Sequence, residues 1–442
     1  MNINEKIKNY EPKLLEIIKN LVSFNSVYDD SNPEYVFGKE NKECLEYMLS
    51  VCEKDGFFTK NLDNYCGYAQ FGDSGELIGI IGHLDIVPAG EGWDTNPFEL
   101  TVKEGTLYGR GVCDDKGSMA AAYIALKIVA DIKKDINKRI RIVFGCNEET
   151  EFRCIDHYVK KEGHFDIGFT PDGPFPLCHG EKGIVHYSFK VKSEIFKSLS
   201  AGVAVNSVPS IARFELNSNF DEIAFESYLI ENGLSLTKKD SQFTVYGKAA
   251  HGSTPENGIN ALTYTLLGLY NQFNNDEALS LFNKYFNNSF NGDNLDVHYH
   301  DLSGLLTMNV GRANLVEGKI HFEIDVRVPI TVSNQEVLDK IEKYLGNYEF
   351  KIEGNKKSLY YPLDKPIVTK LMKAYTDVMG EAKPVTMGGG TYARGINNCV
   401  AFGPEFEGYD SHMHDVNECT TLENLNKSIE IYVNALLNLL ED

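Results

Sequence analysis

The first half of the chain contains the stretches LIGII at 77–81, GSMAAAYIALKIVADIKK at 117–134, RIRIVFG at 139–145 and DIGFT at 166–170. The three short runs predict buried strands, because each is too short and too apolar to form a surface helix. The longer stretch repeats apolar side chains at spacings of three and four, which predicts a helix with a packed face. Those side chains belong to Met119, Tyr123, Leu126 and Val129. Strands that alternate with a helix predict an α/β fold.

The pattern changes near residue 184. Apolar and polar residues alternate, as in strands with one buried face, in IVHYSFKV (184–191), ARFEL (212–216), QFTVYGKAA (242–250) and GKIHFEIDVRV (318–328). Only two clear helical patterns, near 258–273 and 334–345, lie among them. This segment predicts a smaller open sheet with helices on one side.

After about residue 358 the chain returns to the first pattern. It contains a helix near Lys365, the glycine-rich MGGGTYAR (387–394), an apolar strand CVAFG (399–403) and a terminal helix from Leu422. We expect this tail to rejoin the first domain. The predicted organisation is a mixed-sheet α/β domain of residues 1–183 and 358–442, with residues 184–357 inserted as an α+β domain.

The charge balance argues against two classes of partner. The chain has 43 Lys and Arg against 64 Asp and Glu, a formal net charge of -21. This charge repels nucleic-acid phosphates and anionic lipid headgroups over most of the surface. We therefore expect no nucleic-acid and no membrane partner.

The N-terminus and the cysteines indicate a cytoplasmic protein. The first 24 residues place Ile and Leu among charges at helical spacing, which predicts an amphipathic surface helix and not a signal peptide or membrane span. Nine cysteines, with no CxxC pair, occur in a chain too large to need disulfides. Reduced thiols and a cytoplasmic location are the expectation.

Polar side chains follow the predicted strands at the points where the apolar runs stop. The carboxyl ends of strands in open α/β sheets are where functional sites assemble. These side chains are His83 and Asp85 in GHLDIVP, Glu148 and Glu149 in GCNEET, and Asp172 in TPDG. Loops supply Asp114 and Asp115 in YGRGVCDDKGS and His414 in HMHDVNE.

This set of donors predicts a metal centre. Histidines together with carboxylates suit zinc or manganese. Carboxylates that converge on one pocket could not all stay ionised without bound cations. Each residue alone has an ordinary alternative, since an Asp after a strand is usually a helix cap and a lone His is usually a surface or core group. Chance alone explains the whole set poorly.

The motifs resemble, in order along the chain, those of the aminoacylase and carboxypeptidase family of cocatalytic zinc peptidases. They are GHLDIVP, YGRGxxDDKG, NEET, TPDG, the AAHGSTP of the inserted segment and the terminal HxVNE. The PepV and carnosinase type of dipeptidase is the most similar branch. The resemblance spans residues 66–418 and implies a zinc-peptidase catalytic domain with an inserted lid domain. It implies a hydrolase, a dinuclear metallopeptidase that cleaves dipeptides.

By this resemblance the chain binds two divalent metal ions, zinc foremost and manganese or cobalt as alternatives. The implied ligands are His83 and Asp172 for one ion, Glu149 and His414 for the other, and Asp114 as the bridge.

Two further acids receive roles beside these ligands. Glu148, the remaining acid of NEET, is then the general base that takes a proton from the attacking water and passes it to the leaving amine. Asp85 lies two residues beyond His83 on the same side of a strand, so we expect it to hold the second imidazole nitrogen. The resemblance also implies a cis peptide between Asp114 and Asp115.

The chain departs from the family pattern at two positions. Many relatives have Asp where Asn147 stands and Gly where Glu151 stands, so an extra carboxylate lies close to the predicted site. His412 lies two residues from His414, which leaves the terminal ligand open to either residue. We choose His414 because its four-residue interval to Glu418 is the family's.

The resemblance implies that the inserted segment closes over the site and recognises the substrate. His251 of AAHGSTP would donate to the oxyanion, Arg327 of DVRVP would pair with the substrate's free carboxylate, and Asn206 of VNSVP would assist. An ordinary surface ion pair with Glu323 or Asp325 is the alternative for Arg327. The glycine-rich segment could form a nest of N–H donors for the same carboxylate or oxyanion. Its residues are Gly388, Gly389, Gly390 and Thr391.

Two other functions remain open. An N-acyl amino-acid deacylase of the desuccinylase or deacetylase type would share the metal core, and a catalytically silent binding protein would share the fold. DDKG and DVRVP favour dipeptides, and no ligand or base is missing. The expected partner is a small peptide substrate, with the chain a monomer or a homodimer. The remaining histidines match no motif and are expected to be structural: His157, His164, His179, His186, His298, His300 and His321.

Overall fold

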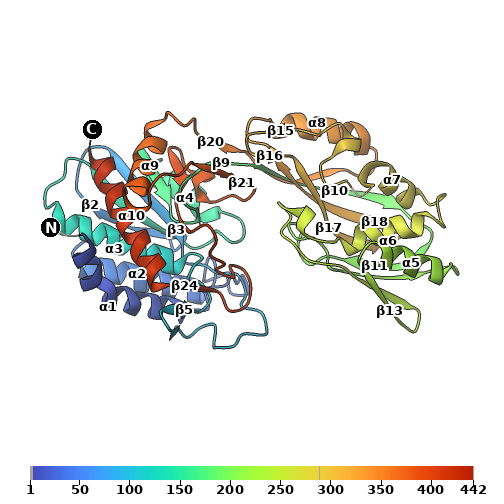
Figure 1. Cartoon of the computed structure of the whole chain (residues 1–442), viewed down its shortest axis with the longest axis horizontal. Helices are drawn as coiled ribbons and strands as arrows, with labels where there is room; N and C mark the ends of the chain where they lie inside the picture. Colours follow the sequence, from blue (N-terminus) through green and yellow to red (C-terminus); the bar gives the residue numbers. More distant parts are fainter. Residues whose placement is uncertain (1–2, 288, 442) are drawn as a thin grey trace. The chain divides into compact units, whose positions relative to one another are not determined.

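The computed structural model describes residues 3–287 and 289–441, and the chain divides into two compact units (Figure 1). The first unit comprises Met1–His179, Tyr361–Val385 and Thr391–Asp442. The second unit comprises Gly180–Tyr360 and Thr386–Gly390. The short segment 386–390 therefore groups with the second unit, whereas the sequence placed it in the tail of the first domain.

A mixed sheet of nine strands contains the predicted apolar runs. Its order is β1-β2-β6-β3-β7-β22-β9-β20, with β21 paired to β9. The run LIGII lies in β3, which pairs in parallel with β6 on one side and β7 on the other. The predicted mixed α/β fold is confirmed. The bounds are β1 Phe58–Leu62, β2 Cys66–Phe71, β3 Leu77–His83, β6 Arg139–Gly145, β7 Ile167–Thr170, β9 Cys178–Glu181, β20 Leu359–Tyr360, β21 Val385–Met387 and β22 Cys399–Ala401.

The helix predicted between the first two strands is α3 (Lys116–Ile132), and it is buried on more than the one predicted face. Residues 116–126 are all buried, because α1 (Ile3–Val22) and α10 (Leu422–Leu440) both pack against α3. A helix enclosed in this way needs small residues, which the Ala120–Ala122 run supplies. The other helices of the first unit are α2 Lys39–Lys54, α4 Arg153–Glu162 and α9 Pro366–Met379.

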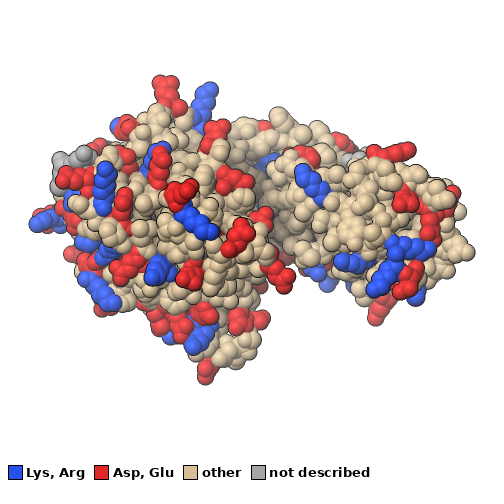
Figure 2. Space-filling model, turned by 60° about the horizontal axis from the view of Figure 1, so that its bottom comes forward, with Lys and Arg blue, Asp and Glu red and all other residues tan. Residues whose placement is uncertain are grey.

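The N-terminal segment forms α1, an amphipathic helix as predicted. Its buried side chains are Ile7, Leu14, Ile17, Ile18, Leu21 and Val22. In the part of the chain that the structure describes, no helix combines the length and the apolar character needed to cross a bilayer. Figure 2 shows acidic side chains spread over the visible face of the first unit, with lysines and arginines interspersed among them.

Two small pairings bring distant loops of the first unit together. β24 (Cys419–Thr421) pairs with β5 (Thr106–Tyr108), which in turn pairs with β4 (Thr101–Lys103). β23 (Pro404–Glu405) pairs with β8 (Gly173–Pro174). The first pairing places the C-terminal HxVNE motif beside the loop that contains the DDKG motif.

The second unit is built on an eight-stranded sheet in the order β13-β14-β12-β11-β17-β18-β10-β19. Every neighbouring pair in it is antiparallel. Four of these strands, β11, β13, β17 and β19, were not predicted from the sequence. The bounds are β10 Gly183–Lys192, β11 Phe196–Ala201, β12 Ile211–Leu216, β13 Ser235–Lys239, β14 Gln242–Tyr246, β17 Thr307–Val316, β18 Lys319–Val328 and β19 Lys351–Lys356. A short hairpin joins β15 His300–Asp301 to β16 Gly304–Leu305.

The second unit also has more helices than the sequence predicted. The two predicted helices are α6 (Ala261–Tyr270) and α8 (Asn334–Leu345), and α5 (Glu222–Glu231) and α7 (Glu277–Phe286) are additional. Each additional helix follows an Asp whose side chain accepts a bond from the backbone N–H three residues later. These N-caps, Asp221 and Asp276, were readable signals that the sequence interpretation did not use.

Candidate active site

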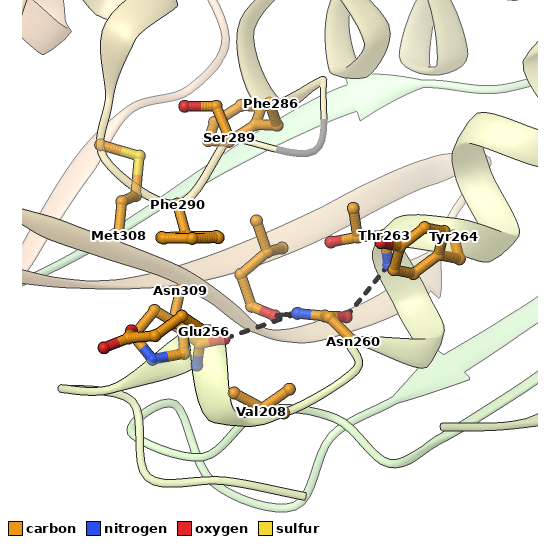
Figure 3. A pocket seen from close by; sticks show the side chains of 13 residues that line it. Val208, Glu256, Asn260, Thr263, Tyr264, Phe286, Ser289, Phe290, Met308 and Asn309 are labelled. Atoms are coloured by element: carbon orange, nitrogen blue, oxygen red, sulfur yellow. Dashed lines mark hydrogen bonds between the residues drawn. The ribbon is translucent and has the colours of Figure 1, made fainter. Parts of the chain in front are cut away.

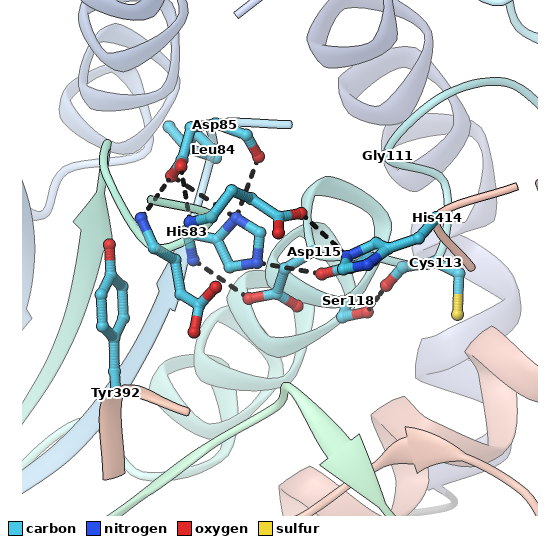
Figure 4. A network of polar contacts seen from close by, with 12 residues as sticks. His83, Leu84, Asp85, Gly111, Cys113, Asp115, Ser118, Tyr392 and His414 are labelled. Carbon is cyan, nitrogen blue, oxygen red and sulfur yellow. Dashed lines mark hydrogen bonds and ion pairs between the residues drawn. The ribbon is translucent and has the colours of Figure 1, made fainter. Parts of the chain in front are cut away.

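The candidate site lies at one edge of the first unit's sheet, where three parallel strands end. β3 ends at His83, β6 ends two residues before Asn147, and β7 ends just before Asp172 is reached. Because β3 lies between β6 and β7 and runs parallel to both, the loops that follow these strands meet at the same edge. Figure 4 shows the polar network that results.

The site gathers histidine and carboxylate atoms into two overlapping groups. His83 Nε2 lies 3.0 Å from Asp114 Oδ1. His414 Nε2 lies 2.8 Å from Asp114 Oδ2 and 3.2 Å from Glu149 Oε1. Two sets of three donors place their ligand atoms within 4.8 Å of one another: His83, Asp114 and Glu149, and His83, Glu148 and Asp172.

The ring of His83 is oriented by its surroundings as a metal ligand requires. Its Nδ1 lies 2.9 Å from the backbone carbonyl oxygen of Asp85 and donates to it. With Nδ1 bonded to this carbonyl, Nε2 is the nitrogen that faces the carboxylate cluster and that would bind an ion. The Asp85 carboxylate lies farther from this nitrogen, at 3.5 Å, and accepts the backbone N–H groups of Glu148 at 3.1 Å and Glu149 at 3.0 Å. Asp85 thus contacts the imidazole through its main chain and the acid-bearing loop through its side chain.

The acids of the cluster resist ionisation together. Burial and the charge of Asp114 raise the pKa of Asp172 to about 8. Burial and the charge of Asp172 raise the pKa of Glu148 well above its usual range, and burial with the Asp114 charge raises that of Glu149. Burial opposes ionisation of Asp114 too, but hydrogen bonds from His414 and His83 lower its pKa.

In this arrangement the two imidazoles, of His83 and His414, favour their protonated, positively charged forms. Burial opposes the charge on His414, yet hydrogen bonds to Asp114 and Glu149 raise its pKa to about 11. The pKa of His83 is raised against burial in the same way, by hydrogen bonds to Asp114 and Asp85. The Oδ1 atom of Asp115, which lies beside the cluster, is buried and accepts no hydrogen bond among the described residues. Excess buried carboxylate with an unsatisfied oxygen is what a divalent cation would relieve, so the residues fit a metal centre.

The structure distinguishes His412 from His414 as the candidate ligand and shows where Glu151 lies. Both histidines are exposed, but the backbone N–H of His412 donates to Asp410, whereas the imidazole of His414 contacts Asp114 and Glu149 of the cluster (Figure 4). Glu151 is exposed and pairs with Arg153 at 3.1 Å, so the extra carboxylate lies outside the donor groups.

A buried glutamate, Glu418, organises the loop that presents the bridging candidate. Its Oε2 accepts from Arg110 Nη1 at 2.8 Å and from the backbone N–H of Gly111 at 2.9 Å. Its Oε1 accepts from the backbone N–H groups of Cys113 at 2.9 Å and Asp114 at 3.1 Å. The sequence interpretation used Glu418 only as a spacing marker, and the HxVNE motif itself was the signal for this role.

The peptide that follows this loop adopts the expected conformation. The bond between Asp114 and Asp115 is cis, as the resemblance implied. Asp115 is fully buried and its Oδ2 accepts the backbone N–H of His83 at 3.1 Å. The loop and the end of β3 are therefore connected directly.

A buried tyrosine, Tyr392, contacts the NEET loop, and the sequence interpretation missed this residue. The hydroxyl of Tyr392 accepts the backbone N–H of Asn147 at 3.3 Å and lies 2.7 Å from Cys154 Sγ. Its ring meets the ring of His83 edge-on, with centroids 6.3 Å apart (Figure 4). A Cβ at Gly145 would lie 2.5 Å from this hydroxyl, so a larger residue cannot stand there.

In the second unit, Arg327 of β18 is held by two partners. Its Nε lies 3.0 Å from both carboxylate oxygens of Asp325, and its Nη1 donates to the carbonyl oxygen of Gly388 at 2.8 Å. His186 Nε2 lies 3.2 Å from the same Asp325. The ion pair with Asp325 that the sequence left open is therefore present, but it is buried and not on the surface. Glu323 pairs with Arg312 instead.

His251 and Asn206 lie on neighbouring loops of the second unit. Ser253 donates its backbone N–H to His251 Nδ1 at 3.2 Å, and the Ser253 Oγ is 2.6 Å from that nitrogen. An Nδ1 that accepts leaves the hydrogen of the neutral ring on Nε2. The side chain of Asn309 donates to the carbonyl oxygens of Val205 and Ser207, which fixes the backbone on both sides of Asn206.

The glycine-rich segment is divided between the units. Gly389 and Gly390 belong to the second unit, and Thr391 belongs to the first. Thr391 is buried and its hydroxyl accepts the backbone N–H of Ala393 at 3.2 Å. A Cβ at Gly388 would lie 2.8 Å from the Cβ of Ser253, so glycine is required for this close approach. A role for Gly389, Gly390 and Thr391 in substrate binding remains a prediction.

Comparison with known sequences identifies relatives over the full chain. A sequence profile described as peptidase family M20/M25/M40 matches residues 79–438. A candidate dipeptidase of Staphylococcus haemolyticus is 35% identical over 466 residues, which cover 98% of each chain. A candidate dipeptidase of Staphylococcus aureus is 34% identical over 463 residues, again 98% of each chain.

Solved structures share the fold. Human carnosine dipeptidase 1 matches with a TM-score of 0.62 and 14% identity, over 100% of this chain and 98% of that chain. A dipeptidase of Saccharomyces cerevisiae matches with a TM-score of 0.61 and 16% identity, over 100% and 98%. A peptidase of Bacillus subtilis described as binding a dinuclear metal matches with a TM-score of 0.55 and 13% identity, over 98% of this chain and 99% of that chain.

Proposed function

The chain belongs to peptidase family M20/M25/M40 and is a hydrolase of the metallopeptidase class, and from this premise we propose that it hydrolyses dipeptides at a dinuclear metal centre. One observation carries the proposal. Four acidic side chains and two imidazoles converge where the sheet's parallel strands end, and burial together with mutual repulsion raises the pKa of Asp172 and of Glu148, a strain that bound cations would relieve. The curated relatives that match 98% of the chain are named as candidate dipeptidases, which supports the choice of substrate.

Two divalent ions would be held by the clustered donors, with zinc foremost and manganese or cobalt as alternatives. When bound, they supply the Lewis acidity that activates a water and polarises the scissile carbonyl. We assign His83 and Asp172 to one ion, Glu149 and His414 to the other, and Asp114 to both. The carbonyl of Asp85 keeps the hydrogen of His83 on Nδ1 and so leaves Nε2 for the ion.

Glu148 is the proposed general base. Its buried position raises its pKa, so the carboxylate can take up a proton from the attacking water and hold it. The same group then delivers that proton to the leaving amine. The backbone N–H of Glu148 donates a hydrogen bond to the Asp85 carboxylate, and this bond fixes the loop that carries the base. No covalent intermediate is required.

The second unit is proposed to act as the lid and to read the substrate. Arg327 would pair with the free carboxylate of a dipeptide, because its Nη2 edge is not used by Asp325 or Gly388 in the contacts described above. His251 would donate from Nε2 to the developing oxyanion, since its Nδ1 is an acceptor for Ser253. Asn206 would assist on the adjacent loop. An anchored guanidinium defines where the substrate must end, which favours dipeptides over longer peptides.

A cytoplasmic location is also proposed, from the chemistry of the thiols. All nine cysteines are free and buried, so none forms a disulfide that an oxidising compartment would favour.

A substrate panel tests the proposed function. Metal-loaded protein is assayed with dipeptides, the matching tripeptides, and N-acetyl and N-succinyl amino acids. A Glu148→Gln protein purified and loaded in the same way is the matched inactive control. We expect dipeptides to be cleaved with the highest kcat/KM and the control to show no comparable turnover. If N-acyl amino acids were cleaved with the highest kcat/KM instead, the protein would be a deacylase and the proposed dipeptidase function would be wrong.

A further inference from the structure

Two loops of the second unit present His251 and Asn206, and backbone contacts join these loops to each other. Asn206 lies on the loop between β11 and β12, His251 lies on the loop after β14, and both residues are exposed. Ser207 and His251 form an isolated antiparallel bridge, and the backbone N–H of Gly252 donates to the carbonyl oxygen of Asn206 at 2.6 Å. A contact that anchors the first loop to the sheet therefore also sets the position of His251 on the second.

The side chain of Asn309 is such an anchor. Asn309 lies on β17 and is only 2% exposed. Its Nδ2 donates to the carbonyl oxygen of Val205 at 3.1 Å and to that of Ser207 at 2.9 Å, so the two bonds span Asn206. An amide nitrogen carries two hydrogens, and both are used here. Without this amide the two carbonyl oxygens would need other donors, and the loop would have to shift to reach them.

The amide of Asn309 is itself oriented by a neighbouring amide. Asn260 Nδ2 lies 3.5 Å from Asn309 Oδ1 and donates to the carbonyl oxygen of Val310 at 3.0 Å. Asn260 Oδ1 accepts the backbone N–H of Thr263 at 3.0 Å. Figure 3 shows the side chains of Asn260 and Asn309 in the lining of a hollow of the second unit. Because the Oδ1 of Asn309 is turned to Asn260, its Nδ2 faces the loop.

A neighbouring residue of the same sheet supports Arg327 instead. Asp325, which accepts from Arg327 Nε, is the register partner of Asn309 across β17 and β18. A Cβ on Gly252 would lie 2.5 Å from Asp325 Oδ2, so the backbone of the second loop passes close to this carboxylate. Asn309 and Asp325 are thus adjacent, but Asn309 bonds to a loop and Asp325 bonds to the guanidinium. An experiment on Asn309 has to separate these two routes.

We propose that Asn309 is a positioning residue for the hydrolysis, because it fixes the pair of loops from which His251 acts. The inference rests on the proposed function, which assigns the oxyanion contact to His251. Because Asn309 is buried whereas His251 is exposed, the effect of Asn309 reaches the substrate through His251. The oxyanion develops in the transition state, so a misplaced donor lowers kcat more than it raises KM.

The first test removes the amide of Asn309 and compares the result with removal of a matched amide. Asn309→Ala should lower kcat for a dipeptide at least about tenfold and leave KM within about threefold. Asn309→Ser keeps one donor, should lose less activity, and replaces the alanine variant if that variant does not fold. Asn217→Ala is the control and should leave kcat unchanged. The exposed Asn217 also donates from Nδ2 to two carbonyl oxygens, those of Glu194 at 2.9 Å and Phe196 at 3.2 Å.

A double-mutant cycle then shows whether Asn309 acts through His251. In the His251→Ala background, Asn309→Ala should change kcat by less than about threefold, because the group that it positions is already absent. The same loss in both backgrounds would make Asn309 a residue of general stability and would overturn the inference. A dipeptide amide, which offers Arg327 no carboxylate, should suffer the same loss as the free dipeptide. A loss confined to the free dipeptide would place the effect at Asp325 and Arg327 and would also overturn the inference.

Failure of this inference and failure of the proposed function give different results. A wild-type protein that cleaves dipeptides, with no coupling between Asn309 and His251, would overturn the inference alone. A wild-type protein that prefers N-acyl amino acids would refute the proposed function, and the same cycle would then be measured on that substrate. Coupling between Asn309 and His251 on that substrate would uphold the positioning role, and additive losses would overturn it.

Discussion

Glu418→Gln is the substitution for which the structure predicts the largest effect on stability from the smallest change in shape. The Glu418 side chain has no exposed surface, and its two oxygens accept four hydrogen bonds. Glutamine keeps one of these oxygens and presents an NH₂ group in place of the other. That NH₂ group faces two donors, either Arg110 with Gly111 or the backbone of Cys113 with Asp114.

The size of the effect follows from Arg110. Its side chain is 2% exposed, and its other described hydrogen bonds, to the carbonyl oxygens of Pro88 and Ala89 at 3.4 Å, supply no negative charge. Removing one partner of a buried ion pair leaves an uncompensated charge and costs about 3 to 5 kcal/mol. We expect the free energy of unfolding of the first unit to fall by this amount in metal-free protein.

The chain provides its own reporter for the measurement. Trp93 is the single tryptophan, and its ring lies 5.2 Å from the Arg110 guanidinium carbon. Urea unfolding followed by tryptophan fluorescence, in the presence of a chelator, therefore reports on the region that the substitution disturbs. Glu423→Gln is the control, because that glutamate is 75% exposed and forms an ion pair with Lys427 at the helix surface. The control should leave the unfolding midpoint unchanged.

Metal content provides the second measurement on the same protein. Because Glu418 holds the backbone N–H of Asp114, its loss should also weaken zinc binding, measured by competition with a chromophoric chelator. An unchanged midpoint in the metal-free variant would refute the energetic argument. A lowered midpoint with unchanged zinc affinity would show that the hydrogen bonds to Glu418 stabilise the loop without positioning Asp114.

Three further predictions concern the chemistry. The purified protein should contain close to two divalent ions per chain, and chelation should abolish an activity that zinc, manganese or cobalt restores; full activity without metal would contradict the proposed centre. Glu148→Gln should lower kcat at least about a hundredfold while metal analysis finds both ions, and the same result from Glu149→Gln instead would reverse the two roles. Arg327→Lys keeps a charge beside Asp325 but loses the planar fork, so it should slow a dipeptide at least about tenfold more than its C-terminal amide; equal losses would make Arg327 a structural residue.

Local patterns were sufficient to predict four strands of the first unit's sheet, β3, β6, β7 and β22, and the positions of the candidate donors; β1, β2, β9, β20 and β21 were not predicted. LIGII and RIRIVFG became β3 and β6, because short buried strands are recognisable from their own composition. His83 ends β3, Glu148 follows β6 and Asp172 follows β7, so parallel pairing of these strands brings the three side chains to one edge. The helix α3 and the strands β6 and β7, which lie between these three residues in the chain, are themselves recognisable from local sequence.

The second unit shows where local patterns were insufficient. α5 and α7 each span ten residues, and the sequence interpretation passed over both although each follows a capping Asp. Strands such as β13 and β19 are largely exposed and so lack a clear alternation of buried and exposed residues. Their existence depends on pairing with β14 and β10, which is a property of the assembled sheet.

The sequence by itself determined which residue types follow the strands and therefore which chemistry the first unit can support. Only the tertiary structure decided which distant groups hold those residues in place. Glu418 meets Arg110 across 308 positions of sequence, and Tyr392 meets Asn147 across 245. Asp325 and Arg327 are only two residues apart, but the sequence left their ion pair as a surface alternative, and the tertiary structure decided that the pair is buried. Such contacts depend on burial and on the low polarity around the paired groups, and both arise only when the chain has folded.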